Sequence, residues 1–246
     1  MKNKVLYILL SVMLLAAWQY FGSNSHTARL LLSSPSLVVD YFGENYLALL
    51  QATQTTLIEA VAGLLIATVF SFGVMILCLY KPKLMGFVLP IMITSQVIPL
   101  IVLAPFFIIL MGIGMGSKIA MAALMCFFPI FVNFAQGYKA ISQNIHELMH
   151  IYNADTWTRI RNVYFPLAIP SIMAGLKISA TLAVIGAIVA EFTGAEKGLG
   201  KNLFLSAIRL EPDLMMSSLI LSSFLGALLF GSIIIIEKRL TRWNEK

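Results

Sequence analysis

The stretch Ala60–Tyr80, AVAGLLIATVFSFGVMILCLY, holds no charged residue and decides the fold class. A membrane-spanning helix needs about 20 predominantly apolar residues at a rise of about 1.5 Å each, and this stretch has that length. Further uncharged stretches that are at least about as long cover Leu84–Ser117, Ile119–Tyr138 and Leu214–Ile236. The pattern predicts an integral membrane protein built from helices.

The composition of the whole chain supports the same class. Of its 246 residues, 59% are hydrophobic and 11% are charged, whereas soluble domains have about 25% charged residues. The formal charge of +6 does not indicate nucleic-acid binding, because the basic residues flank the apolar runs, where lipid headgroups require them. Cys78 and Cys126 lie inside apolar runs, so we expect small buried hydrophobes and neither a disulfide nor a metal site.

We expect a single all-α membrane domain over residues 1–246 with six spanning helices. Their approximate ranges are 5–21, 53–79, 84–111, 119–138, 167–192 and 214–236. The first follows Met1-Lys2-Asn3-Lys4, as a signal peptide would, but no small-x-small cleavage site closes it. Trp18, Tyr20 and Phe21 end it instead, and such aromatic residues are typical of a membrane interface. The sequence therefore favours a retained first helix.

The segment Gly22–Gln51, between the first two spans, is amphipathic. Within it, Ser34-Pro35 predicts the start of a short helix lying on the membrane surface, with Pro35 in the first turn and Ser34 as the cap. Small residues at four-residue spacing, such as Gly63 and Ala67 or Gly175 and Ser179, predict close helix packing inside the membrane.

The distribution of Lys and Arg predicts which way the chain faces. With the N-terminus in the cytoplasm, eleven lie inside: Lys2, Lys4, Lys81, Lys83, Lys139, Arg159, Arg161, Lys238, Arg239, Arg242 and Lys246. Five lie outside: Arg29, Lys118, Lys197, Lys201 and Arg209. Lys177 falls within the fifth span. This bias indicates six spans with both termini in the cytoplasm.

The longest polar segment on the inner side is the loop 140–166, between the fourth and fifth spans. Its pattern predicts two short amphipathic helices with a break near Asn153, because Asn tolerates the left-handed conformation. Asp155 or Thr156 is expected to cap the second helix, and Pro166 lies where the next span begins.

This loop resembles the coupling loop of ATP-binding-cassette importer permeases. That pattern has Glu-Ala-Ala, three residues, Gly, nine residues, an aliphatic residue, one residue, Leu and Pro. Counted from Glu147, the Gly position falls on Asn153, the aliphatic on Val163, the Leu on Phe165 and the Pro on Pro166. The spacing holds throughout, although Leu148 and Met149 replace the two alanines.

The resemblance extends from about Leu31 to Trp243. It includes Leu32-Ser33-Ser34-Pro35, Ser95-Gln96-Val97-Ile98-Pro99 and Phe127-Phe128-Pro129-Ile130-Phe131-Val132-Asn133. The branch resembles the nitrate, sulfonate, taurine and thiamine-pyrimidine permeases. Within that branch, the segment from Gly175 to Gly194 is most similar to permeases for pyrimidine precursors or riboflavin.

The resemblance implies a permease subunit that is not itself an enzyme. Two permease copies would form the pathway, a separate pair of ATP-binding subunits would hydrolyse ATP with Mg²⁺, and an extracytoplasmic binding protein would deliver the substrate. This chain would bind no cofactor or metal. The substrate would be a small vitamin precursor, with nitrate, sulfonate or taurine as the alternative. The residues placed against the ATPase would be Glu147, Leu148, Met149, Tyr152, Asn153, Ala154 and Pro166.

Candidates for lining the pathway are Ser95, Gln96 and Pro99 in the third span and Lys177 and Thr181 in the fifth. A charge at mid-bilayer costs roughly 2.5–3.5 kcal/mol, so Lys177 is expected to snorkel or to face the pathway or a carboxylate. Glu59 and Glu191 lie nearer the outer surface, where a plain interfacial role is expected.

Two short motifs suggest other functions. His146-Glu147-Leu148-Met149-His150 matches the H-E-x-x-H pattern of zinc proteases, but a catalytic zinc needs a third ligand. The remaining histidine, His26, is expected across the membrane. Gly194–Asn202 resembles a phosphate-binding loop, but Ala195 and Asn202 stand where such a loop needs Gly and Ser or Thr. We therefore expect neither proteolysis nor ATP hydrolysis by this chain.

Overall fold

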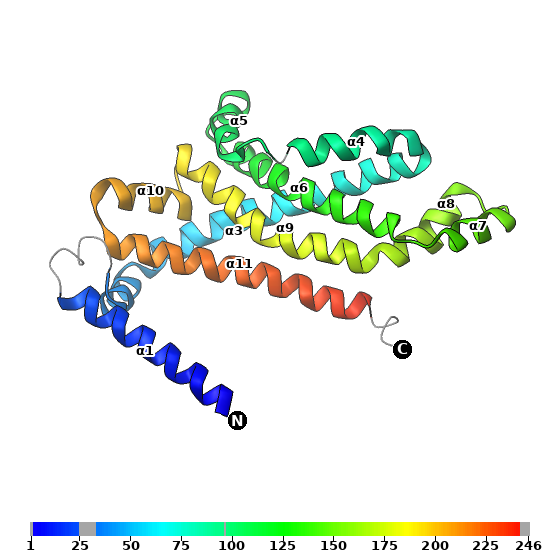
Figure 1. Ribbon diagram of the computed structural model, residues 1–246. Helices are drawn as coiled ribbons and strands as arrows, with labels where there is room; N and C mark the ends of the chain where they lie inside the picture. Colours follow the sequence, from blue (N-terminus) through cyan, green and yellow to red (C-terminus); the bar gives the residue numbers. More distant parts are fainter. Residues whose placement is uncertain (1, 25–32, 96, 242–246) are drawn as a thin grey trace.

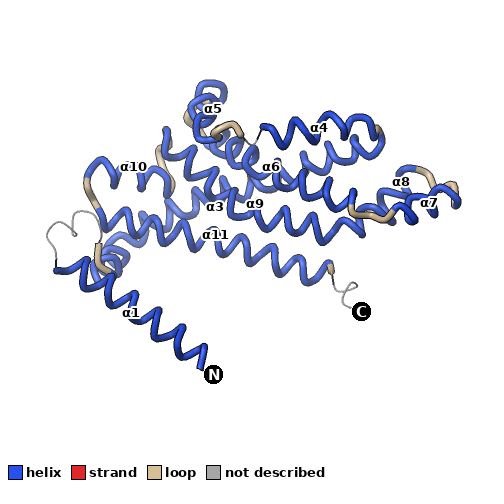
Figure 2. Tube along the Cα trace, in the orientation of Figure 1, coloured by secondary structure: helices blue, strands red, loops and turns tan. Residues whose placement is uncertain are grey.

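The computed structural model describes residues 2–24, 33–95 and 97–241, and the regular structure in these residues is helical (Figures 1 and 2). The helices are α1 (Lys2–Asn24), α3 (Pro35–Tyr80), α4 (Pro82–Ser95), η1 (Leu100–Val102), α5 (Leu103–Met111), α6 (Met115–Lys139), α7 (Gln143–Ile151), α8 (Thr156–Arg159), η2 (Ile160–Tyr164), α9 (Phe165–Gly194), α10 (Leu199–Arg209) and α11 (Pro212–Leu240). His26, Arg29, Leu31, Leu32, Gln96, Arg242, Trp243 and Lys246, on which parts of the sequence interpretation depend, lie outside the described residues.

The core lies between α3, α6, α9 and α11, which run side by side along the molecule (Figure 1). Small residues let these helices approach closely. A Cβ added to Gly63 of α3 would come within 2.5 Å of the Ala122 Cβ on α6, and one added to Gly175 of α9 would meet the Asn133 Cβ at 2.8 Å. The predicted packing role of these glycines is confirmed, because any larger residue would push the helices apart.

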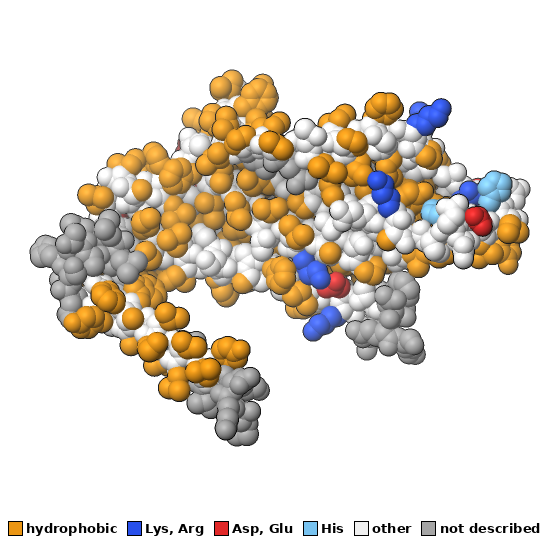
Figure 3. All heavy atoms as spheres, in the orientation of Figure 1, with side chains coloured by type: hydrophobic (Ala, Val, Ile, Leu, Met, Phe, Trp, Pro, Cys, Tyr) orange, Lys and Arg blue, Asp and Glu red, His pale blue; other side chains and the backbone are white. Residues whose placement is uncertain are grey.

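Four stretches of the described chain are long and apolar enough to cross a membrane. They are Pro35–Tyr80, Met115–Lys139, Thr156–Gly194 and Pro212–Leu240, and they contain the predicted second, fourth, fifth and sixth spans. Hydrophobic side chains cover most of the visible surface over these helices, as contact with lipid requires (Figure 3).

The predicted third span is not one continuous helix. Its range is divided between α4, η1 and α5. Pro99 accounts for the break, because it lacks an N–H and disfavours the helical conformation of the residue before it. Gly112, at φ 80°, then ends α5.

The predicted surface helix is not separate from the second span. It forms the first turns of α3, which bends at Asn45, where φ is −116° and ψ is 19°. Pro35 lies in the first turn as predicted, but the Ser34 side chain makes no capping bond to the helix. The Ser34 hydroxyl pairs with that of Ser36 at 3.1 Å instead.

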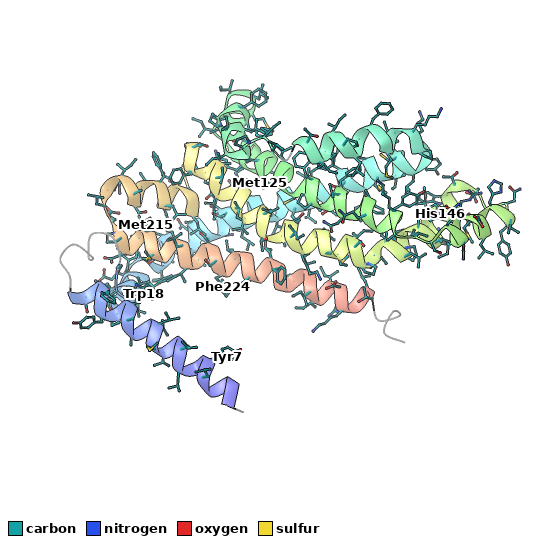
Figure 4. All side chains as sticks on the ribbon, viewed as in Figure 1. Tyr7, Trp18, Met125, His146, Met215 and Phe224 are labelled. Carbon is teal, nitrogen blue, oxygen red and sulfur yellow. The ribbon has the colours of Figure 1, made fainter. Side chains whose placement is uncertain are left out.

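Helix α1, the predicted first span, leans away from the bundle and packs mainly on α3 (Figure 1). Trp18, which is labelled in Figure 4, attaches the C-terminal part of α1, since Nε1 donates to the Ser33 carbonyl at 2.8 Å. Gln19 adds bonds to Ser36.

The two ends of the bundle differ. One end, which we call the loop end, carries α7, α8, the α3–α4 turn and the last turns of α11 (Figure 1). The opposite end, which we call the α10 end, carries α10 and the turn between α5 and α6. The loop end holds the turn around Asn153, and the α10 end holds the buried side chains of Glu59, Lys118 and Glu191.

Candidate functional site

At the loop end, α7 ends in a left-handed turn at Asn153, whose φ is 47°. The Ala154 N–H bonds the Met149 carbonyl at 3.2 Å, and the Asn153 N–H bonds the His150 carbonyl at 3.0 Å. These two bonds define a Schellman motif, which satisfies carbonyls that the helix end leaves free. The left-handed conformation predicted at Asn153 is confirmed.

The helix that follows this turn is capped by Asp155, one of the two residues predicted for this position. Its carboxylate accepts bonds from the Thr158 backbone N–H at 3.2 Å and from the Thr158 hydroxyl. The hydroxyl bond, followed by the backbone bond, lowers the pKa of the Asp155 carboxyl. On the other side of the turn, Arg159 Nε donates to the Ala154 carbonyl at 2.7 Å. The direction of the chain between α7 and α8 is therefore fixed by bonds inside the loop.

An aromatic cluster anchors α7 to the bundle. The ring of His146, which is labelled in Figure 4, packs against Tyr138 of α6 and Tyr164 of η2, with ring centroids 5.6 and 5.1 Å apart. His146 Nδ1 also lies 3.1 Å from the Tyr164 hydroxyl. No three His, Cys, Asp or Glu side chains among the described residues are grouped to hold a metal. Aromatic packing therefore accounts for His146, the first histidine of the H-E-x-x-H pattern.

The start of the fifth span contains a wide helical turn. The Phe165 N–H bonds the Ile160 carbonyl, five residues back, in the π-helix η2. Pro166 follows in the first turn of α9, where its missing N–H costs little. Such π turns are frequent at functional sites. Here the turn connects the loop directly to the helix that leads through the bundle.

Large apolar side chains are exposed on the loop beyond the long helices. The exposed fractions are 45% for Leu148, 79% for Ile151, 73% for Tyr152 and 51% for Trp157. Glu147 and Asn153 are exposed beside them, whereas Met149, Ala154 and Pro166 are half-buried. Exposed apolar patches with a polar rim mark protein–protein or membrane interaction sites. The loop end is therefore a candidate contact surface.

The expected pathway residues lie in two places. Ser95 ends α4, which packs on α3 and α6, and the exposed Pro99 follows it. Lys177 and Thr181 lie one turn apart on α9. The Lys177 ammonium pairs with the Glu237 carboxylate of α11 at 2.9 Å, and the Thr181 hydroxyl donates to the Ile178 carbonyl of its own helix. Lys177 thus faces a carboxylate, which is one of the three alternatives that the sequence left open.

At the α10 end, the interfacial role expected for Glu59 and Glu191 is wrong. Their exposed fractions are 2% and 1%, and Lys118 beside them is 2% exposed. Glu191 accepts bonds from the Thr56 hydroxyl at 2.6 Å and from the Gly200 N–H at 2.6 Å. We call Thr56, Glu59, Lys118 and Glu191 the buried polar cluster. It joins α3, α6, α9 and α10.

The segment Gly194–Asn202, whose sequence resembles a phosphate-binding loop, contacts this cluster. Gly198 has φ 129°, and a Cβ there would come within 2.2 Å of the Glu191 carboxyl. The N–H groups of Leu199 and Gly200 point at Thr56 Oγ1 and Glu191 Oε2. The first N–H groups of a helix have no partner within the helix, and here one of them bonds a carboxyl oxygen of the same chain. Gly198 and Gly200 therefore allow the backbone to approach the Glu191 carboxyl of the same chain.

The comparisons with known proteins identify the family. Residues 61–246 match the family of binding-protein-dependent transport system inner membrane components. The chain belongs to this family, as the resemblance of its loop implied. It is therefore a multi-pass inner-membrane permease of an ABC importer and not an enzyme, and family membership implies an ATPase and a binding protein as partners.

Individual relatives are similar over most of the chain. A probable ABC transporter permease of Haemophilus influenzae is 31% identical over 234 residues, which is 95% of this chain and 96% of the relative. The formylaminopyrimidine transport permease ThiX of Halalkalibacterium halodurans is 33% identical over 75% of this chain and 74% of its own. The riboflavin transport permease RibX of Chloroflexus aurantiacus is 29% identical over 95% of this chain and 88% of its own.

Proposed function

We propose that α7, the Asn153 turn and α8 dock this permease on a separate ATPase and transmit its movement to α9. The observation that carries this proposal is the left-handed Schellman turn, which presents exposed apolar side chains at a fixed angle. The path for transmission is short, because η2 joins α8 to α9 without a break in the helix. ATP and Mg²⁺ would be handled by the partner, and two copies of this permease would form the pathway.

The orientation that we propose puts the loop end and both termini in the cytoplasm. Lys81, Lys83, Lys139, Arg159 and Arg161 all lie in or beside turns of the loop end. This distribution agrees with the rule that short cytoplasmic loops carry the excess of Lys and Arg. It also places the docking surface on the side where ATP is available.

The transported molecule that we propose is a small heteroaromatic vitamin precursor. Support comes from the similarity of the chain to the formylaminopyrimidine and riboflavin permeases. Relatives named for aliphatic sulfonates and taurine are 24–31% identical, so these sulfonate compounds are the alternative. Uptake of labelled aminopyrimidine, riboflavin and taurine by the intact transporter distinguishes the two. Uptake of taurine alone would contradict the substrate proposal and leave the permease function in place.

Docking is tested by Glu147→Ala, with Glu44→Ala as the matched control. Glu147 is exposed on α7, and Glu44 is exposed on α3 toward the opposite end. A hydrogen bond to a charged group contributes about 1.5–3 kcal/mol, so losing one lowers affinity about tenfold or more. We expect Glu147→Ala to insert normally in the membrane but to retain about a tenth of the ATPase on purification. Equal retention by both variants would show that Glu147 does not hold the partner.

A further inference from the structure

A groove of about 520 Å³ lies at the turn between α3 and α4, at the loop end of the bundle. Its lining residues are Lys81, Pro82, Lys83, Leu84 and Phe87. Figure 3 shows basic side chains at this turn, next to the hydrophobic surface of α4. Positive charge and apolar surface therefore lie side by side in this groove.

The positive charge at the groove has no counter-charge in the adjoining helices. No Asp or Glu occurs between Glu59 and Glu147, so the second half of α3 and all of α4, α5 and α6 lack acidic residues. Helix α4 packs on α3 and α6, which means that its neighbours near the groove supply no anion. Lys81 and Lys83 are exposed, and neither forms an ion pair with a carboxylate of the described residues. Both ammonium groups are thus available to an anion outside the chain.

Helix α4 presents an apolar face that begins at these lysines. Met85 is buried and Leu89, four positions on, packs partly buried against the core, so this side of the helix faces the bundle. Phe87 and Ile91 point away from the bundle, with exposed fractions of 72% and 60%. Phe87 follows Lys83 by four positions, which puts the two side chains on one face of the helix. This face therefore offers an ammonium at its start and hydrocarbon contacts along the next two turns.

We propose that this groove binds an anionic phospholipid, whose phosphate pairs with Lys81 and Lys83 and whose acyl chain lies along Phe87 and Ile91. Clusters of basic residues at the cytoplasmic ends of membrane helices attract anionic headgroups. A zwitterionic lipid has the same chains without the net charge, and a soluble anion has the charge without the chains. The groove offers partners to both parts of the molecule, which favours the anionic lipid over either alternative.

A lipid in this groove would connect two helices at the membrane surface. Lys81 is the single residue between α3 and α4, and the other end of α4 leads to the break at Pro99 in the third span. The bound headgroup would thus hold the start of the segment in which the sequence places candidate pathway residues. Assignment to the cytoplasmic leaflet rests on the proposed orientation, whereas the pairing of charge and hydrocarbon rests on the groove itself.

The test measures quenching of a tryptophan in the groove by brominated lipids, with the permease–ATPase complex reconstituted in vesicles. Phe87→Trp supplies the tryptophan, and the wild-type complex gives the signal of the native tryptophans for subtraction. The vesicles are equal mixtures of phosphatidylglycerol and phosphatidylcholine, with bromine on the chains of one lipid or the other. Each lysine near the surface attracts an anionic lipid about fivefold, so we expect phosphatidylglycerol to be preferred about tenfold or more at position 87. Equal quenching by the two lipids would overturn the proposal.

Matched variants show whether the two lysines hold the lipid. Lys81→Gln together with Lys83→Gln, made in the Phe87→Trp protein, should remove the preference for phosphatidylglycerol. Lys238→Gln together with Arg239→Gln removes two cations from the last turn of α11, at the same end of the bundle, and should leave the preference unchanged. All four side chains are exposed, so the fold does not depend on them. A preference that survives the first pair of changes, or that falls equally with both pairs, would overturn the site.

The outcome does not depend on the proposed transport function. Brominated lipid is present in both leaflets, so the preference is measured whichever side the loop end faces. Glycerol 1-phosphate, a headgroup fragment without chains, should not compete, and its displacement of phosphatidylglycerol would overturn the lipid as the occupant. If reporter fusions place the loop end outside, the proposed orientation is wrong, and a preference that depends on Lys81 and Lys83 would still support the lipid site.

Discussion

The two ends of the bundle use the same backbone chemistry for different purposes. At the loop end, a left-handed Asn153 precedes a short helix that is capped by the neighbouring Asp155. At the α10 end, Gly198 at positive φ precedes α10, whose first N–H groups bond Thr56 and Glu191 from other helices. The first arrangement is exposed and complete within a few residues. The second is buried and assembled from four helices.

This difference predicts different consequences of mutation. The exposed turn at Asn153 is complete within a few residues. Changes there should therefore affect binding of the partner ATPase more than the stability of the permease. Removing one member of a buried polar group leaves the others without partners, at a cost of roughly 1–3 kcal/mol for each neutral group and more for a charge. Changes at the α10 end should therefore reduce the amount of folded protein before any effect on transport is seen.

The largest effect concerns the placement of the two ends on opposite sides of the membrane. Reporter fusions after Lys83, Gly116, Lys139 and Lys201 should report inside, outside, inside and outside. The result is all or none, because a reporter domain lies on one side only. An outside signal at Lys139 would contradict both the orientation and the assignment of the loop to ATPase docking.

Gly198→Ala should give the largest loss of stability. The new Cβ would meet the Glu191 carboxyl at 2.2 Å, and φ 129° is unfavourable for alanine. Backbone strain of about 1–3 kcal/mol and overpacking of about 1–3 kcal/mol are expected together. Thermal unfolding in detergent measures the loss. Gly226→Ala on α11 is the control, since a Cβ there meets nothing within 4 Å, and equal unfolding temperatures for the two variants would refute the buried arrangement.

Asn153→Val should act on docking and transport, with a smaller loss of stability than Gly198→Ala because its exposed side chain meets no buried group. The left-handed conformation costs roughly 1–2 kcal/mol for an ordinary residue, and a β-branched side chain resists it further. We expect about tenfold less ATPase on the purified permease and a similar fall in uptake. Asn153→Gly should remain at the wild-type level, because glycine adopts positive φ freely. A wild-type result for Asn153→Val would mean that the turn angle does not matter for coupling.

His146→Ala with His150→Ala should have the smallest effect. The first change removes aromatic contacts with Tyr138 and Tyr164, which contribute about 0.5–1.5 kcal/mol, and the second removes an exposed side chain. Transport should be largely retained, with a slightly lower unfolding temperature due to His146. Metal analysis of the purified protein completes the experiment. One zinc per chain, lost in the double variant together with a proteolytic activity, would restore the protease interpretation.

Local patterns in the sequence were sufficient for the turn and the cap at the loop end. The turn at Asn153 and the cap at Asp155 depend on bonds between residues at most five positions apart, so the sequence places both partners together. The apolar length of Pro35–Tyr80, Met115–Lys139, Thr156–Gly194 and Pro212–Leu240 is also a local property, and it makes these helices long and apolar enough to cross a membrane.

The tertiary structure alone decided the α10 end. Glu191 and Thr56 are 135 positions apart, and Lys118 and Gly194 are 76 apart, so no local pattern shows that they meet. An acidic residue near the end of an apolar helix is compatible with either an interfacial or a buried position. The packing of the helices buries Glu59 and Glu191. The only signal in the sequence was the presence of Glu59 and Glu191 next to apolar runs, where ionisable residues are costly. Hydrogen bonds between neighbours are encoded by spacing, whereas bonds between distant helices depend on how the whole bundle closes.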